Sequence, residues 1–249
     1  MHYPMNETYR WNPAEGIVGV LGVAPTATAD FYRRLAALTP ARKDWEHVRV
    51  LIDSNPKLPS RGRHLELGET DPSPFIAAGI RELLARGATV VAVPCNTAHV
   101  LYPRYAAEFP RHSVPHMIDL AVAALEGADG AVPQRLAVLG SRHTVTHDLY
   151  GARLRPRGGG CLDMTRCQPE ISALIEHVKQ GRDPAEAAAR LRAAMRDGER
   201  AGADAFVIAC TELSALAQPG WVEARVVDSS DTLARHCLAA VRREVAAAA

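Results

Sequence analysis

The sequence predicts an α/β protein of two similar lobes, each built on a mostly parallel sheet flanked by helices. Strand-like and helix-like segments alternate along the 249 residues, a pattern typical of parallel sheets covered on both faces. A strand, turn and helix segment near the start recurs in the second half, and so does a segment centred on a cysteine. Two copies of one folding unit explain all three observations.

The first repeat pairs residues 19–35 with residues 137–154. The two segments read GVLGVAPTATADFYRRL and AVLGSRHTVTHDLYGARL, with Gly22 aligned to Gly140. Each has an apolar β-branched run, a glycine, a loop rich in Ser, Thr or His, and an amphipathic stretch. This order predicts a strand followed by a helix with a polar entrance.

The second repeat aligns Cys95 with Cys210. The segments read GATVVAVPCNTA and GADAFVIACTEL, and in each an apolar, strand-like run precedes the cysteine and polar residues follow it. A third match sets residues 117–119 against residues 226–228. Three matches in the same order, with slowly drifting offsets, indicate a duplicated unit whose loops have changed in length.

The remaining elements follow from periodicity and from Pro and Gly signals. We predict a strand at 47–53, a proline-broken loop at 54–63, and helices at 73–86, 168–180, 183–201 and 230–247. The first lobe, with Cys95, comprises residues 16–121 plus 227–249. The second lobe, with Cys210, comprises 122–226, and residues 1–15 form a tail.

Composition excludes several classes of protein. Hydrophobic residues make up 47% of the chain, and 29 Lys and Arg against 28 Asp and Glu give a formal net charge of +1. We therefore expect neither a nucleic-acid nor a membrane partner. An odd count of five cysteines argues against a disulfide scaffold. The polar N-terminus resembles no signal peptide, which predicts a cytoplasmic protein.

The paired cysteines point to one reaction class. Ligands of open parallel sheets bind beyond the carboxyl ends of the strands, where both cysteines are predicted to lie. Facing lobes would place the two thiols on opposite walls of one cleft. Racemisation needs an acid and a base on opposite faces of a carbon, and a thiol and a thiolate can serve in these roles. A single cysteine after a strand is usually a packing residue, but matched positions favour a functional pair.

Polar residues beside the cysteines are candidate substrate contacts. Asn96, Thr97 and Thr211 can donate hydrogen bonds to a carboxylate, and Thr144 opens the first helix of the second lobe. His99 has no counterpart after Cys210, so we expect it to support Cys95 rather than to form a catalytic Cys–His pair. The other cysteines, Cys161, Cys167 and Cys237, lack the spacing of a metal site, and we expect no metal.

Four segments together resemble the aspartate/glutamate racemase superfamily. VPCNTAH at 93–99 and ACTELS at 209–214 are similar to its two signature segments. LGVAPTATADFYRRL from residue 21 and SNPKLPSR at 54–61 resemble the aspartate racemase branch. The resemblance extends from about residue 16 to about residue 241. It implies a two-lobed α/β fold, an isomerase without any cofactor such as pyridoxal phosphate, and a homodimer.

The resemblance also implies roles for individual residues. Cys95 and Cys210 would be the catalytic pair, while Asn96, Thr97 and Thr211 would bind the substrate's α-carboxylate or amino group. Arg61 and Lys179 occupy the positions of two cationic contacts to an acidic substrate, whose distal carboxylate suits the guanidinium fork. The loop that ends at Pro25 would line the cleft.

That loop also departs from the branch. Where the branch has GGMGP, this chain has Gly22-Val23-Ala24-Pro25, which is one residue shorter and bulkier. The expected function is racemisation of an amino acid, aspartate or glutamate first, with other amino acids open. Alternatives are a hydantoin racemase, a decarboxylase or a cis-trans isomerase acting on a small carboxylate, and a non-catalytic small-molecule-binding protein.

Overall fold

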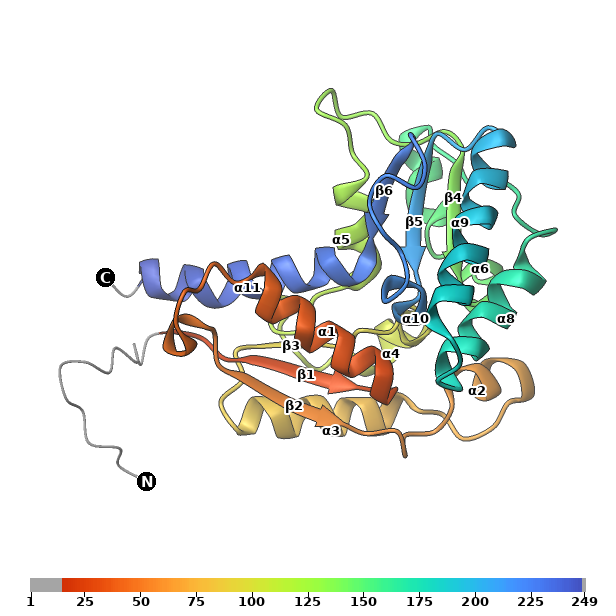
Figure 1. Ribbon diagram of the computed structural model, residues 1–249. Helices are drawn as coiled ribbons and strands as arrows, with labels where there is room; N and C mark the ends of the chain where they lie inside the picture. Colours follow the sequence, from red (N-terminus) through yellow and green to blue (C-terminus); the bar gives the residue numbers. More distant parts are fainter. Residues whose placement is uncertain (1–14, 248–249) are drawn as a thin grey trace.

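Two three-stranded parallel sheets form the centre of the molecule (Figure 1). The computed structural model describes residues 15–247, so the predicted tail lies outside the described residues apart from Glu15. The first sheet has the order β2-β1-β3, from β1 Val18–Gly22, β2 Val50–Ser54 and β3 Val90–Ala92. The second has the order β4-β5-β6, from β4 Leu136–Gly140, β5 Ala205–Ala209 and β6 Arg225–Asp228. This architecture confirms the predicted α/β class.

Helices connect the strands in each half of the chain. The first half contains α1 Pro25–Leu38, α2 Arg61–Leu67, α3 Ser73–Ala85, α4 Tyr102–Tyr105 and α5 Met117–Ala124. The second contains α6 Arg142–Thr146, α7 Gly151–Leu154, α8 Gln168–Lys179, α9 Pro184–Arg200, α10 Thr211–Ser214 and α11 Ser229–Ala247. The helices predicted at 73–86, 168–180, 183–201 and 230–247 are confirmed to within a residue at each end.

The strand predicted at 47–53 begins later, at Val50. Its pairing partner β1 begins at Val18, which lies opposite Val50 and donates its N–H to the Arg49 carbonyl at 3.1 Å, so β1 offers no partner to the residues before Arg49. A short 3₁₀ turn, Asp44–Glu46, precedes them.

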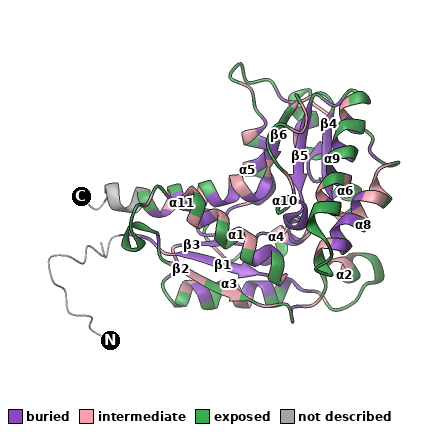
Figure 2. Cartoon of the chain, viewed as in Figure 1, coloured by how far each residue is buried: buried purple, intermediate pink, exposed green. Residues whose placement is uncertain are grey.

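Both sheets are covered on both faces, as Figure 2 shows by the burial of β1, β3, β4 and β5. Along β1, Val18 and Val20 point to one face and Leu21 to the other, the period-2 alternation of a strand. Helices α1 and α11 cover the first of these faces, and α3 covers the second. Helices α8 and α9 cover the outer face of the second sheet. Continuous apolar strands are typical of such doubly covered sheets.

The two halves exchange helices. Helix α11 leaves the second sheet after β6 and returns beside α1 to cover the first sheet (Figure 1). Helix α5 leaves the first sheet and packs Ile118, Ala121 and Val122 against the second. The proposed lobes, 16–121 plus 227–249 and 122–226, therefore interlock along their boundary, with residues 227–228 pairing in the second sheet.

The third repeat match joins two elements of different type. Residues 226–228 belong to strand β6, whereas residues 117–119 begin helix α5. In the first lobe, the Val91 N–H donates to the Ser113 carbonyl at 2.7 Å, as a further strand would require. The next bond of a parallel ladder would need an N–H at residue 115, which is a proline, so the pairing stops there.

Within residues 15–247, no helix is both long enough and apolar enough to cross a membrane.

Candidate active site

A cleft of about 350 Å³ lies between the two sheets and is lined by residues of both halves of the chain. Cys95 and Cys210 both line it. A larger cavity of about 740 Å³ lies elsewhere, between α4, α5 and α11, and contains neither of these thiols. The pairing of two thiols, rather than size, therefore identifies the candidate site.

Each cysteine reaches the cleft from the carboxyl end of a buried strand. Cys95 follows β3, and its N–H donates to the Val93 carbonyl at 2.8 Å in a tight turn. Cys210 follows β5 directly, and its carbonyl accepts from the N–H groups of Leu213 and Ser214 in α10. The duplicated strand ends thus carry the two thiols to one cleft, as the repeat predicted.

Cys210 has a carboxylate as its immediate partner. Its Sγ–H donates to Oε2 of Glu212 at 3.0 Å, and the Thr211 hydroxyl donates to the same oxygen at 3.3 Å. Glu212 is only 5% exposed. Burial, followed by the nearby Glu212 charge, raises the pKa of the Cys210 thiol well above its usual value. Glu212 is not among the predicted site residues, although it stands two residues after a predicted catalytic cysteine.

His99 supports the backbone of Cys95. Its Nδ1 contacts the Cys95 carbonyl at 2.9 Å, and its Nε2 accepts from the Met117 N–H at 3.1 Å. A carbonyl can only accept, so Nδ1 must carry the proton and the ring is a neutral tautomer. Burial lowers the His99 pKa to about 4, which favours the same state. His99 therefore fixes the turn that carries Cys95, as expected.

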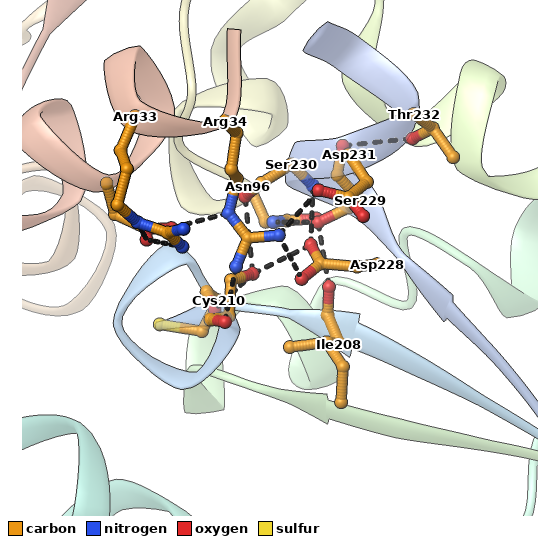
Figure 3. Close-up of polar contacts among 12 residues, drawn as sticks. Arg33, Arg34, Asn96, Ile208, Cys210, Asp228, Ser229, Ser230, Asp231 and Thr232 are labelled. Carbon is orange, nitrogen blue, oxygen red and sulfur yellow. Dashed lines mark hydrogen bonds and ion pairs between the residues drawn. The ribbon is translucent and has the colours of Figure 1, made fainter. Parts of the chain in front are cut away.

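Asn96 lines the cleft, and its side chain bonds to residues of both lobes; Figure 3 shows the bond to Ser229. Its Nδ2 donates to the Ser229 hydroxyl at 3.0 Å, and its Oδ1 accepts from the Tyr150 hydroxyl at 2.7 Å. Ser229 in turn donates to the Ile208 carbonyl. One amide N–H of Asn96 is thus left for a ligand.

The predicted threonines divide into two groups. Thr97 and Thr211 line the cleft, and the Thr97 hydroxyl contacts that of Ser141 across the lobes at 2.7 Å. Thr144 is buried behind Ser141, at 3.0 Å between hydroxyl oxygens, and is not among the residues that line the cleft. Ser141, which lies at the N-terminus of the same helix, α6, lines the cleft instead of Thr144.

Pro25 likewise lies outside the lining. It is the first residue of α1, and the preceding Val23 and Ala24 face the cleft instead. The loop between β1 and α1 is only these two residues long, and Pro25 is exposed at the first position of the helix, where its missing N–H leaves no bond unmade.

The two predicted cations differ in how they are neutralised. The Arg61 guanidinium donates to the carbonyls of Val23 and Pro59 at 3.2 and 3.3 Å, while its buried Nε has no partner. In the described part of the chain it makes no ion pair. Lys179 instead pairs with Glu176 at 2.7 Å. Arg61 is therefore the cation of the cleft that most clearly lacks a counter-charge.

Arg34 joins α1 to the end of β6, to α11 and to α10 (Figure 3). Its guanidinium pairs with Asp30 at 2.5 Å, Asp231 at 2.5 Å and Asp228 at 3.0 Å, and it also donates to the Ser214 carbonyl. A matching contact joins Arg153 of the second half to Asp119 at the start of α5. Asp119 and Asp228, which the third match aligns, thus each form an ion pair with an arginine from the other half of the chain.

The three remaining cysteines lie outside the cleft. Cys161 is exposed, Cys167 is half-buried and Cys237 lies on the buried face of α11. No group of three His, Cys, Asp or Glu side chains suited to a metal ion occurs among residues 15–247.

Known proteins resemble the chain over nearly its whole length. The family model for Asp/Glu/Hydantoin racemase matches residues 20–237. The broad specificity amino-acid racemase RacX of Bacillus subtilis (strain 168) is 26% identical over 226 residues, which cover 88% of this chain and 95% of that protein.

Solved structures share the fold. The Picrophilus torridus aspartate racemase aligns with a TM-score of 0.79 and 26% identity, covering 91% of this chain and 94% of that one. A putative Asp/Glu racemase from Yersinia pestis aligns with a TM-score of 0.68 and 19% identity, covering 92% and 99% of the two chains. These matches confirm the resemblance indicated by the cysteine motifs. The chain belongs to the Asp/Glu/hydantoin racemase family and is an isomerase of that family.

Proposed function

We propose that this protein is a cofactor-independent amino-acid racemase in which Cys95 and Cys210 exchange one proton with each face of the substrate's Cα. The observation that carries the proposal is the pair of thiols, which line one cleft from opposite lobes at matching strand ends. RacX and the Picrophilus protein, which are described as amino-acid and aspartate racemases, support the choice of substrate class.

The proposed reaction uses both thiols in each turnover. One thiolate removes the Cα proton, so that the C–H bond breaks and an S–H bond forms. The electron pair delocalises into the substrate carboxylate, and the opposite thiol then protonates Cα on its other face. The Thr97 hydroxyl and the second amide N–H of Asn96 are the nearby donors to the charged carboxylate, and the Thr211 hydroxyl could join them only by leaving Glu212. The reverse direction exchanges the two roles.

For the substrate side chain, we propose an acidic group, with aspartate or glutamate first. Arg61 supports this because its guanidinium lines the cleft and makes no ion pair with any described residue. Lys179 contributes less, since Glu176 already neutralises it. The cytoplasmic location and the homodimer stay predictions from the sequence.

Heavy water tests the function directly. We expect deuterium to enter Cα of both L- and D-aspartate, or both enantiomers of glutamate, together with loss of optical purity. Mass spectrometry and chiral chromatography measure the two events. Neutral amino acids and substituted hydantoins belong in the same panel, since the family includes hydantoin racemases. Failure of every compound to take up deuterium would overturn the proposal.

Replacing Arg61 by leucine tests the acidic substrate. Hydrogen bonds to a charged partner are worth about 1.5–3 kcal/mol, so kcat/KM for aspartate or glutamate should fall roughly 10- to 100-fold. The rate with alanine, which lacks a distal carboxylate, should change little. Arg63→Leu is the matched control because Arg63 lines the same cleft but is paired with Glu69. An equal loss with alanine would contradict this role of Arg61.

A further inference from the structure

We propose that Glu212 is a positioning residue that holds Cys210 as the protonated thiol in the resting protein, which leaves Cys95 as the resting base. This inference rests on the proposed function. It makes the two thiols unequal in the free protein, although the repeat places them at equivalent positions.

The first support is the direction of the hydrogen bonds on Glu212. Oε2 receives the Cys210 Sγ–H at 3.0 Å and the Thr211 hydroxyl at 3.3 Å, so this oxygen acts as an acceptor toward both. An acceptor stabilises the thiol and repels the thiolate. The contact is buried, where water screens the repulsion between a carboxylate and a thiolate only weakly.

The second support is the difference between the two halves. Thr97 occupies the position after Cys95 that Glu212 occupies after Cys210, and its hydroxyl contacts Ser141. Over the described residues, the Sγ of Cys95 has no hydrogen-bond acceptor of its own. One thiol of the pair therefore has a carboxylate partner and the other has none.

The third support is the set of charges around Cys210. Helix α8 presents Lys179 and Glu176, which pair with each other at 2.7 Å, and α2 presents Arg61. Within residues 15–247, Glu212 forms no ion pair with either cation. The negative charge of Glu212 therefore acts on Cys210 and, through space, on Lys179, with Cys95 as the other ionisable group across the cleft.

The consequence for one turnover follows from the proton balance. Cys95 thiolate takes a proton from Cα, and Cys210 thiol gives its proton to the opposite face. The product state then holds a Cys210 thiolate beside the Glu212 carboxylate. Two adjacent buried anions favour uptake of a proton from solvent by Cys210. The resting form returns once Cys95 has also released to solvent the proton that it took from Cα.

Thiol alkylation of the free protein tests this assignment without turnover. Iodoacetamide reacts with thiolates, so the rate of labelling at each cysteine, followed by peptide mass spectrometry against pH, reports its protonation. In Glu212→Gln the charge is lost but size and an acceptor oxygen remain. We expect the apparent pKa of Cys210 labelling to fall by about one unit, equal to a roughly tenfold faster reaction below that pKa. Cys95 labelling should not change.

Glu66→Gln is the matched control. Glu66 lines the same cleft but pairs with Arg142, and its loss should leave Cys210 labelling unchanged. An unchanged Cys210 profile in Glu212→Gln would overturn the inference, as would Cys210 labelling at lower pH than Cys95 in the unmodified protein. If Glu212→Gln does not fold, ultraviolet titration of thiolate absorbance decides the matter: Cys95→Ser should lose the thiolate that forms at the lower pH, and Cys210→Ser should keep it.

The labelling experiment tests the role of Glu212 and the deuterium experiment tests racemisation, so the two proposals can be refuted separately. Deuterium uptake with an unchanged Cys210 profile would refute the role of Glu212 and leave the racemase proposal intact. A shifted profile without deuterium uptake would refute the racemase proposal, and with it the role of Cys95 as a base.

Discussion

Serine in place of either Cys95 or Cys210 should lower racemisation by roughly 10²–10⁴-fold, the usual contribution of a positioned acid or base. The reason is the acidity of the side chain. A serine hydroxyl is far less acidic than a thiol and supplies almost no anion at neutral pH, although it occupies nearly the same space. Polarimetry with an acidic amino acid measures the loss, and thermal unfolding checks that the variants fold.

Cys167→Ser provides the control for this experiment. Cys167 is half-buried and lies outside the cleft, so its replacement should leave the rate unchanged. Each of the two cleft variants should lose activity, because every turnover uses both thiols. Full activity without Cys210 would contradict the two-thiol mechanism and favour chemistry that needs a single proton donor, such as decarboxylation.

Replacing Arg34 by methionine should destabilise the protein by about 3–5 kcal/mol, the usual cost of removing one partner from a buried ion pair. The Arg34 side chain is 11% exposed and pairs with Asp30, Asp228 and Asp231. Methionine fills much of the volume but leaves three carboxylates close together without their shared cation. Urea unfolding followed by circular dichroism measures the free energy of unfolding.

The free energy of unfolding that is lost in Arg34→Met should become smaller as the pH falls. Burial already raises the pKa of Asp228, and a carboxyl whose folded pKa is raised favours folding at low pH and loses that contribution as the pH rises through its folded pKa. Without Arg34 the pKa of Asp228 should rise further. Acid should therefore reduce the difference in the free energy of unfolding between the variant and the parent protein. Arg33→Met is the control because Arg33 is mostly exposed. A gap that is independent of pH would contradict the electrostatic explanation.

The duplicated cysteine segment made both the fold and the thiol pair predictable. Periodicity located the helices, because their apolar faces had to cover parallel strands. The position of a side chain relative to a strand end was also predictable, which is why Cys95, Cys210, Thr97 and Thr211 lie together in the cleft.

What could not be predicted depends on the direction in which a side chain turns. Glu212 could have faced solvent, and only the tertiary structure shows its carboxylate against the Cys210 thiol. Asn96 was predicted as a free donor, but its amide is largely bonded to Ser229 and Tyr150, from parts of the chain remote in sequence. The aligned residues of the third match also did not show that their elements differ, because Pro115, where pairing beyond β3 stops, lies just outside the aligned segment.

The exchange of α5 and α11 has a consequence for the synthesis of the chain. The face of the first sheet that carries Val18 and Val20 is covered partly by Leu233, Cys237 and Leu238 of α11. A nascent chain therefore keeps part of this apolar surface open until α11 has left the ribosome tunnel. A gene cut between the two halves would yield fragments that each lack a helix, and only association of the two could complete either core.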